Sequence, residues 1–221
     1  SVLGYSVAPS ERVMLGEVPY RDFLYNYTPG ILWLNAALMR AFGFETAKTE
    51  IATFGERRVL VVERFDRAWR ADGRLLRLPQ EDLCQALSIP SSRKYQDRGG
   101  PGVLDILGRL QESDDPQRDR AAFFKSQVLF WLVGGTEGHA KNFSLFIRPG
   151  GRFELTPFYD VLTAQPAFGA KQIRHRDFRL AMSLGATPHY RIDDVLGRHF
   201  VESGKAAGLG PTLMRQVMDQ V

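Results

Sequence analysis

The alternation of hydrophobic and polar positions predicts short strands and helices in the first part of the chain. Residues 1–30 show no sustained periodicity and contain several Gly and Pro residues, which favours irregular structure. Residues 31–42 are apolar on nearly every side and end at Gly43, which predicts a buried helix. Residues 50–54 and 58–65 are rich in β-branched and apolar residues and flank a short turn, so they predict two strands.

The pattern then becomes more polar. Residues 71–78 predict a small hairpin, because Asp72 and Gly73 supply its turn. Pro79 is expected to open a helix over residues 79–87. Residues 88–102 are rich in Ser, Gly, Pro and charge, and they indicate a long surface loop, with an interdomain linker as the alternative.

The clearest helical pattern lies in the middle of the chain. Residues 119–133 begin at the acidic Asp119 and run into two glycines, which is typical of a helix and its end. The spacing places four apolar side chains on one face, namely Phe124, Val128, Trp131 and Leu132.

A second hairpin is expected directly after this helix and its loop. Residues 143–147 and 152–155 have strand character and are separated by Arg-Pro-Gly-Gly. The remaining chain alternates helix-like apolar segments with Gly and Pro breaks, without an internal repeat. The whole pattern predicts an α+β fold in which the later part is mostly helical.

Composition narrows the function classes. A chain of 221 residues with 44% hydrophobic residues predicts one large or two small globular domains. We expect a cytoplasmic protein, because the chain has a single cysteine, Cys84, and no secretion signal pattern. We expect no membrane span, because the chain lacks a long apolar run. The net charge of +4 is only a weak indication of nucleic-acid binding. Five basic residues between 171 and 179 are best interpreted as a solvated loop, with phosphate or an acidic partner as the alternative.

One cluster of polar residues carries most of the chemical signal. Glu137, His139, Lys141 and Asn142 fall within six residues after the long helix, and Asp160 follows at the far end of the predicted hairpin. In protein kinases a catalytic carboxylate precedes an Asn by five positions, and two short strands then lead to a second Asp that binds magnesium. Glu137 and Asn142 have this offset, so the order of the residues predicts phosphoryl transfer.

The residue types suit that chemistry. The Asp160 carboxylate and the Asn142 amide oxygen are hard ligands for Mg²⁺, which leaves its other positions to phosphates and water. Glu137 could orient or deprotonate an attacking hydroxyl, and Lys141 and His139 could face the transferred phosphoryl group, although His139 could equally fix the loop. The four His residues lack paired zinc-ligand spacing, and no G-x-S-x-G motif is present.

Several ordered blocks resemble one family. VERFDR at 62–67, LRLPQEDLCQAL at 76–87, PSSRKY followed by GGPG, GTEGHAKNFS at 135–144 and LTPFYD at 155–160 are similar to the HipA toxin kinases of bacterial toxin–antitoxin pairs. The resemblance covers about residues 31–210. It implies a protein-kinase-like fold of the HipA type, with an incomplete small β-containing lobe and hinge over 1–66 and a mostly helical lobe over 67–221.

The resemblance also implies an activity and partners. It implies a Ser/Thr protein kinase that uses ATP and Mg²⁺, acts as a toxin and phosphorylates a protein, with aminoacyl-tRNA synthetases as the known target class. The partner would be a small DNA-binding antitoxin of the HipB type, through which any contact with DNA would be made.

Position by position, the resemblance implies roles for individual residues. Glu63 and Phe65 would form the hinge whose backbone meets adenine, and Gln80 would be a nearby nucleotide contact. His139 and Asn142 match the family's catalytic loop, with His139 also close to the nucleotide. Asp160 matches its magnesium Asp.

The sequence departs from the family pattern in ways that leave alternatives open. Glu137 stands where the family normally carries Asp. Residues 1–30 contain neither a Gly-rich phosphate loop nor a strand-borne lysine, and Lys48 lies in a poor context for that role. The chain is therefore interpreted as a partial kinase. A catalytically impaired, pseudokinase-like module that binds the antitoxin and DNA complex is the first alternative, and a small-molecule kinase is the second.

Overall fold

The computed structural model describes residues 36–220, so the expectations for residues 1–35 lie outside the described part of the chain. Residues 36–41 are helical, in agreement with the helix predicted over 31–42. Its described turns are not buried on every side: Met39 is buried, whereas Arg40 and Ala41 are exposed. The predicted buried helix is thus buried on one side in this part, where Met39 and the partly buried Leu38 meet the core.

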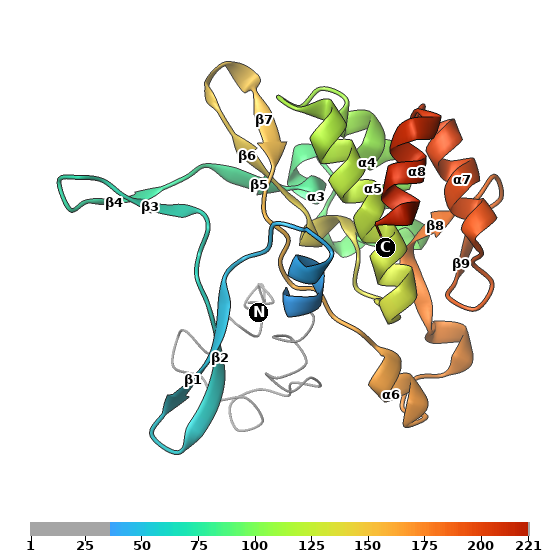
Figure 1. The fold of residues 1–221 in the computed structure, drawn as a ribbon, viewed down its shortest axis with the longest axis horizontal. Coiled ribbons are helices and arrows are strands. Elements are labelled where there is room, and N and C mark those ends of the chain that lie inside the picture. Colours follow the sequence, from blue (N-terminus) through green and yellow to red (C-terminus); the bar gives the residue numbers. More distant parts are fainter. Residues whose placement is uncertain (1–35, 221) are drawn as a thin grey trace.

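Two hairpins project from the body of the molecule on the same side (Figure 1). The first pairs β1 (Thr49–Phe54) with β2 (Arg57–Val62), and the second pairs β3 (Arg67–Trp69) with β4 (Leu75–Arg77), both antiparallel. Gly73 has a φ of 79° in the second turn, a conformation that glycine adopts without strain. The two strands around the first turn are confirmed, although β2 ends at Val62 and not at residue 65. The second hairpin is confirmed at its turn and second strand, but its first strand lies before the predicted residues 71–78.

A three-stranded antiparallel sheet lies between these hairpins and the helices. It contains β5 (Gln80–Asp82), β6 (Ser144–Ile147) and β7 (Phe153–Leu155), in the order β5-β6-β7. The β6–β7 hairpin was predicted, but the helix expected over 79–87 is wrong in its first half. Residues 80–82 pair with β6 instead, and the helix α3 is confined to Leu83–Ala86. Asp82 caps it by accepting from the backbone N–H of Gln85 at 2.9 Å.

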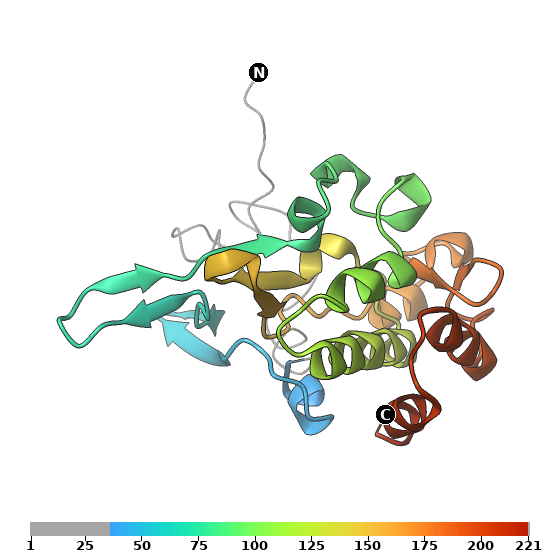
Figure 2. The ribbon, with the colours of Figure 1, turned by 90° about the horizontal axis from the view of Figure 1, so that it is seen from above.

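Helices pack together on the other side of the molecule (Figures 1 and 2). They are α4 (Val103–Leu110), α5 (Pro116–Val133), α7 (Gly197–Ala206) and α8 (Pro211–Asp219). The predicted central helix is confirmed as α5, but it begins at Pro116 with Asp115 as its cap, one turn before Asp119. Phe124 and Val128 are buried as expected, whereas Leu132 is 52% exposed, so its predicted place on the buried face is wrong.

The last part of the chain contains a hairpin that the sequence did not predict. After α6 (Gln165–Gly169), the strands β8 (Arg179–Leu184) and β9 (His189–Arg191) pair antiparallel before α7. The basic cluster at 171–179 is mostly exposed and largely paired, which agrees with a solvated loop. Its ion pairs are Arg174–Asp177, His175–Asp193, Arg176–Asp177 and Arg179–Asp97.

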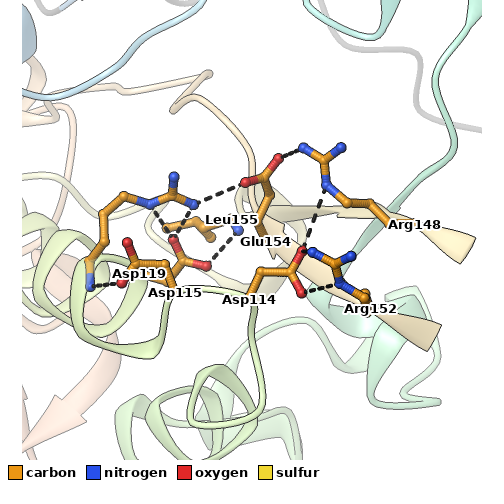
Figure 3. A network of polar contacts seen from close by, with 8 residues as sticks. Asp114, Asp115, Asp119, Arg148, Arg152, Glu154 and Leu155 are labelled. Carbon is orange, nitrogen blue, oxygen red and sulfur yellow. Dashed lines mark hydrogen bonds and ion pairs between the residues drawn. The ribbon is translucent and has the colours of Figure 1, made fainter. Parts of the chain in front are cut away.

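A polar network fastens the β6–β7 hairpin to the start of α5 (Figure 3). The buried Asp119 accepts a hydrogen bond from the backbone N–H of Leu155 at 2.9 Å and another from Arg118 at 2.9 Å. Arg152 binds both carboxylate oxygens of Asp114, at 2.9 and 3.0 Å. Since residues 142 and 160 flank this hairpin, the network helps to set where the two chain segments of the candidate site lie.

Within residues 36–220, no helix combines the length and the apolar character that a bilayer crossing requires.

Candidate functional site

The loop that carries the polar cluster leaves α5 at a sharp angle. Gly134 ends the helix in the left-handed region, with φ of 68°. A Cβ at Gly135 would lie 2.5 Å from the Phe130 ring and 3.1 Å from the carbonyl oxygen of Leu162. The two glycines therefore let the loop fold closely back onto its own helix and onto the segment after Asp160.

Asn142 is fixed by two hydrogen bonds inside this loop. Residues Ala140–Asn142 form a single 3-10 turn, in which the Asn142 N–H donates to the carbonyl oxygen of His139 at 2.9 Å. The side-chain amide of Asn142 donates to the backbone carbonyl of Glu137 at 2.8 Å. Since the amide nitrogen is engaged, the amide oxygen is the atom that Asn142 has left for a ligand.

The carboxylate of Glu137 is held by three side chains. The hydroxyl of Tyr95 lies 2.8 Å from each carboxylate oxygen, His139 Nε2 lies 3.2 Å away and Lys94 Nζ 3.8 Å away. Desolvation acts to raise the pKa of Glu137, but the hydrogen bonds from His139 and Tyr95 and the charges of His139 and Lys94 lower it overall. Glu137 is therefore an ionised carboxylate at neutral pH.

His139 is buried beneath this carboxylate. Its ring meets the ring of Tyr95 edge to face, with centroids 5.0 Å apart, and 3% of the residue is exposed. Its Nδ1 is buried and has no hydrogen-bond partner within the described residues. A buried nitrogen without a partner costs free energy, so this atom suits contact with a ligand.

Asp160 follows β7 in a strained conformation. Its φ of 54° lies in the left-handed region, which costs on the order of 1–3 kcal/mol, and strained residues of this kind cluster at functional sites. No group within residues 36–220 donates a hydrogen bond to its carboxylate, which keeps solvent access. Desolvation by the surrounding protein raises the pKa of Asp160; the charge of His139 lowers it, and that of Glu137 adds to the rise.

These features fit a magnesium site for which the protein supplies only some of the ligands. The uncommitted oxygens of Asn142 and Asp160 are the hard donors that Mg²⁺ prefers, and a carboxylate with a raised pKa gains from a nearby cation. Within the described residues, no group of three or more His, Cys, Asp or Glu side chains could hold a metal alone. A magnesium ion here would therefore take its remaining ligands from phosphates and water.

The predicted hinge is joined to the predicted catalytic loop through aromatic rings. Phe65 contacts Phe146 edge to face, with centroids 5.8 Å apart, and Tyr159 at 5.7 Å. Tyr159 donates to the backbone carbonyl of Lys141 at 3.1 Å. Gln80 pairs with Phe146 across β5 and β6, and its side-chain oxygen is buried without a partner. The structure thus brings Phe65, Gln80 and the residue before Asp160 together.

Glu63 belongs to the same predicted hinge as Phe65. Its side chain is exposed and pairs with Lys48, with Nζ 3.4 Å from the carboxylate, and its backbone N–H donates to the Lys48 carbonyl at 2.9 Å. The side chain is therefore not buried. Only the Glu63 carbonyl and the Phe65 N–H remain for the adenine contact, which stays a prediction.

Sequence reasoning missed Lys94 and Tyr95 as site residues. It noted their block, PSSRKY, but assigned the segment to a surface loop. The hydrogen bond from Tyr95 to Glu137 spans 42 positions, and neither periodicity nor motif spacing reveals such a contact. The expected place of Lys141 near the phosphoryl group stays a prediction, and within residues 36–220 Lys94 is the lysine that pairs with Glu137.

Comparison with known proteins gives a consistent picture. Residues 32–221 match a family model described as the HipA-like C-terminal domain. The chain is 34% identical over 194 residues to Y4mE of Sinorhizobium fredii, provisionally named a kinase, covering 85% of this chain and 44% of Y4mE. It is 35% identical over 144 residues to the serine/threonine-protein kinase toxin HipA of Shewanella oneidensis, covering 59% of this chain and 33% of that toxin.

Solved structures show the same fold. HipA in its complex with HipB and operator DNA, from Shewanella oneidensis MR-1, matches with a TM-score of 0.76 at 23% identity, covering 89% of this chain and 47% of that chain. The Helicobacter pylori proinflammatory kinase CtkA matches with a TM-score of 0.54 at 10% identity, covering 89% and 77%. The fold is therefore protein-kinase-like, and the chain spans less than half the length of the two curated relatives above.

Proposed function

Because this chain belongs to the family of HipA-like C-terminal domains, we propose that it forms the catalytic part of an ATP- and Mg²⁺-dependent Ser/Thr protein kinase. The kinase would act as the toxin of a toxin–antitoxin pair in the cytoplasm. The nucleotide would lie between the hinge end of the part up to residue 66 and the catalytic loop of the part from residue 67 onwards.

One observation carries this proposal: two uncommitted oxygen donors flank the β6–β7 hairpin, next to a positioned carboxylate. Asn142 is oriented by its bond to the Glu137 backbone, and Asp160 is held in a strained conformation with no donor among the described residues. Phosphoryl transfer depends on positioning and charge neutralisation, and this arrangement offers both.

The side chains have distinct roles in this proposal. Asn142 and Asp160 would hold the magnesium ion, which supplies positive charge to the phosphates when bound. The ionised carboxylate of Glu137 would orient the acceptor hydroxyl and take up its proton, and His139 would hold that carboxylate through Nε2. Glu63, Phe65 and Gln80 would bind adenine, for which the buried unpartnered oxygen of Gln80 is a suitable acceptor. Lys141 would add positive charge to the catalytic loop.

The partners follow from the relatives. HipA of Shewanella oneidensis was solved with HipB and operator DNA, and we extend to this chain a small DNA-binding antitoxin of that kind, with DNA reached through it. The acceptor would be a Ser or Thr of a protein, with an aminoacyl-tRNA synthetase as the target class to examine first.

Transfer of labelled phosphate from ATP is the direct test. The chain, Glu137→Asp and Asp160→Ala would each be incubated with Mg²⁺, labelled ATP and cell-extract proteins. We expect labelled protein with the unmodified chain and at least a hundredfold less with Asp160→Ala, because a magnesium ligand is lost. Absence of transfer by every folded form would refute the proposal, and a labelled metabolite in place of protein would favour a small-molecule kinase.

A second candidate function rests on the contact between Tyr95 and the Glu137 carboxylate. The Tyr95 hydroxyl lies close to both oxygens of a carboxylate that is one methylene longer than the family's Asp, which is compatible with a nucleotide-binding module that has lost transfer. In the same experiment, nucleotide binding without transfer by the unmodified chain, together with a gain of transfer in Glu137→Asp, would select this alternative.

A further inference from the structure

The loop between α3 and α4 brings a lysine to the catalytic loop. Lys94 Nζ lies 3.8 Å from the Glu137 carboxylate. About a third of the Lys94 side chain is exposed, at 34%. The ammonium group thus lies beside the Glu137 carboxylate and keeps access to solvent.

The Lys94 ammonium group lies near the Glu137 carboxylate but forms no hydrogen bond with it. At 3.8 Å the contact is an ion pair and not a hydrogen bond, since charge-assisted N–H···O bonds are about 2.7–2.9 Å long. No other hydrogen bond engages Lys94 Nζ within residues 36–220. Its three N–H donors are therefore free to bind an anion.

The loop that carries Lys94 is firmly anchored. Gln96 Oε1 accepts from the backbone N–H of Ser183 in β8 at 2.7 Å, and Arg179 forms an ion pair with Asp97 at 2.5 Å. The loop also closes tightly, because a Cβ at Gly100 would lie 2.1 Å from the carbonyl oxygen of Arg93. These contacts fix the backbone on both sides of Lys94.

Aromatic packing fixes the side chain as well. Lys94 Nζ lies over the Tyr95 ring, 5.1 Å from its centroid, and this ring is itself held by Glu137 and His139. A cation above an aromatic ring is stabilised by the ring's quadrupole. The position of the Lys94 ammonium is therefore set by the same residues that hold the catalytic carboxylate.

The negative charges at the candidate site indicate a role for Lys94. Glu137 and Asp160 alone would repel a triphosphate, and a magnesium ion would neutralise only part of the combined charge. Lys48 is paired with Glu63 at the hinge, and of the lysines within residues 36–220 only Lys94 forms an ion pair with Glu137. Lys94 is thus the lysine best placed to meet phosphate at the Glu137 end of the site.

We propose that Lys94 binds the terminal phosphate of a nucleoside triphosphate. The inference rests on the proposed function. It assigns a phosphate contact to the segment between α3 and α4, on the same loop as the tyrosine that positions Glu137.

The test is a binding comparison that needs no catalytic turnover. The affinities of Mg-ATP, Mg-ADP and adenosine would be measured calorimetrically for the unmodified chain, Lys94→Met, Lys94→Arg and the control Lys205→Met, which changes an exposed lysine in α7. Thermal melting would verify that each variant is folded. We expect Lys94→Met to weaken Mg-ATP about tenfold or more, Mg-ADP less, and adenosine less than twofold. Lys94→Arg should retain most of the Mg-ATP affinity.

Three other results would overturn the inference. An unchanged Mg-ATP affinity in Lys94→Met would remove Lys94 from the site while leaving the proposed kinase intact. Equal weakening of Mg-ATP and Mg-ADP would show a general charge effect in place of a contact with the terminal phosphate. No binding of any nucleotide by the folded, unmodified chain would refute both this inference and the proposed function.

Discussion

The hydroxyl of Tyr95 lies 2.8 Å from each of the two carboxylate oxygens of Glu137. The single phenol O–H is therefore shared between the two oxygens of a residue that is one methylene longer than an Asp, and it makes the shortest side-chain contact with this carboxylate. A longer side chain has more rotamers, and a catalytic group displaced by about 1 Å can cost on the order of a hundredfold in rate. Tyr95 limits that freedom, so it acts as a positioning residue for Glu137.

Tyr95→Phe should therefore reduce turnover without weakening nucleotide binding. The change removes only the hydroxyl and keeps the ring beneath Lys94. We expect kcat to fall about tenfold, because the carboxylate loses its principal hydrogen bond, while the KM for ATP changes less than twofold. Steady-state phosphorylation with varied ATP would separate the two quantities.

The matched control is Tyr190→Phe in β9, a partly buried tyrosine outside the site. It should leave both constants unchanged. In Glu137→Asp the shorter arm no longer reaches Tyr95 in the same way, so adding Tyr95→Phe should then cost less than it does in the unmodified chain. A full and equal loss in both backgrounds would contradict positioning through Glu137.

A second prediction concerns the close packing of the catalytic loop. Gly135→Ala would place a methyl group 2.5 Å from the Phe130 ring, and we expect it to destabilise the fold by about 1–3 kcal/mol because this ring or the loop must move. The control is Gly108→Ala in α4, where no atom lies within 4 Å of the new Cβ. That change should stabilise the fold by about 0.5–1 kcal/mol. Urea unfolding would measure both, and equal effects would contradict the tight approach.

The parts of the fold that are determined by residues close together in the sequence could be predicted from it. The β1–β2 hairpin, the β6–β7 hairpin and the helix α5 follow from turn residues and short-range periodicity, and the order of Asn142 and Asp160 around the hairpin pointed to the site. The strand β5 could not be found this way, because Gln80–Asp82 becomes a strand only by pairing with β6, about sixty residues later. Its polar residues otherwise look like the start of a helix.

The same limit applies to the candidate site. The motif order reveals residues on the catalytic loop itself, since they are close together in sequence. Lys94 and Tyr95 reach Glu137 only because their loop is anchored to β8 through Gln96, a contact with no local signal. The exposure of Leu132 was missed for a related reason. Helical spacing shows which side chains share a face of α5, but it does not show which of them have a packing partner.

A third prediction tests the network that fastens the β6–β7 hairpin to α5 (Figure 3). Asp119→Ala would leave the backbone N–H of Leu155 without its acceptor, and we expect a loss of about 2–3 kcal/mol in the free energy of unfolding. Asp114→Ala removes surface ion pairs with Arg152 and Arg148 and should cost less than Asp119→Ala, because surface ion pairs are screened by solvent. Chemical denaturation would measure both variants, and a larger loss for Asp114→Ala would contradict this ranking.

A fourth prediction concerns the buried Asp66, which lies just after the hinge. Burial acts to raise the pKa of its carboxyl, but the hydrogen bonds and charges of Arg64 and Arg67 lower the pKa overall. A carboxyl whose pKa is lower in the folded state stabilises the protein above its unfolded pKa of about 3.9, and this contribution is lost as the pH falls towards the folded value. The stabilisation by Asp66 should therefore be complete at pH 7 and decline below about pH 4.

Comparison with Asp66→Asn isolates this effect from the other carboxyl groups. The uncharged amide keeps the shape of the side chain but loses the charge facing the two arginines, so the variant should be about 2 kcal/mol less stable at pH 7. Urea unfolding of both proteins between pH 7 and pH 3 should show this difference shrinking as Asp66 becomes protonated in the unfolded chain. A difference that stays constant over this range would mean that the Asp66 charge does not stabilise the turn between the hinge and β3.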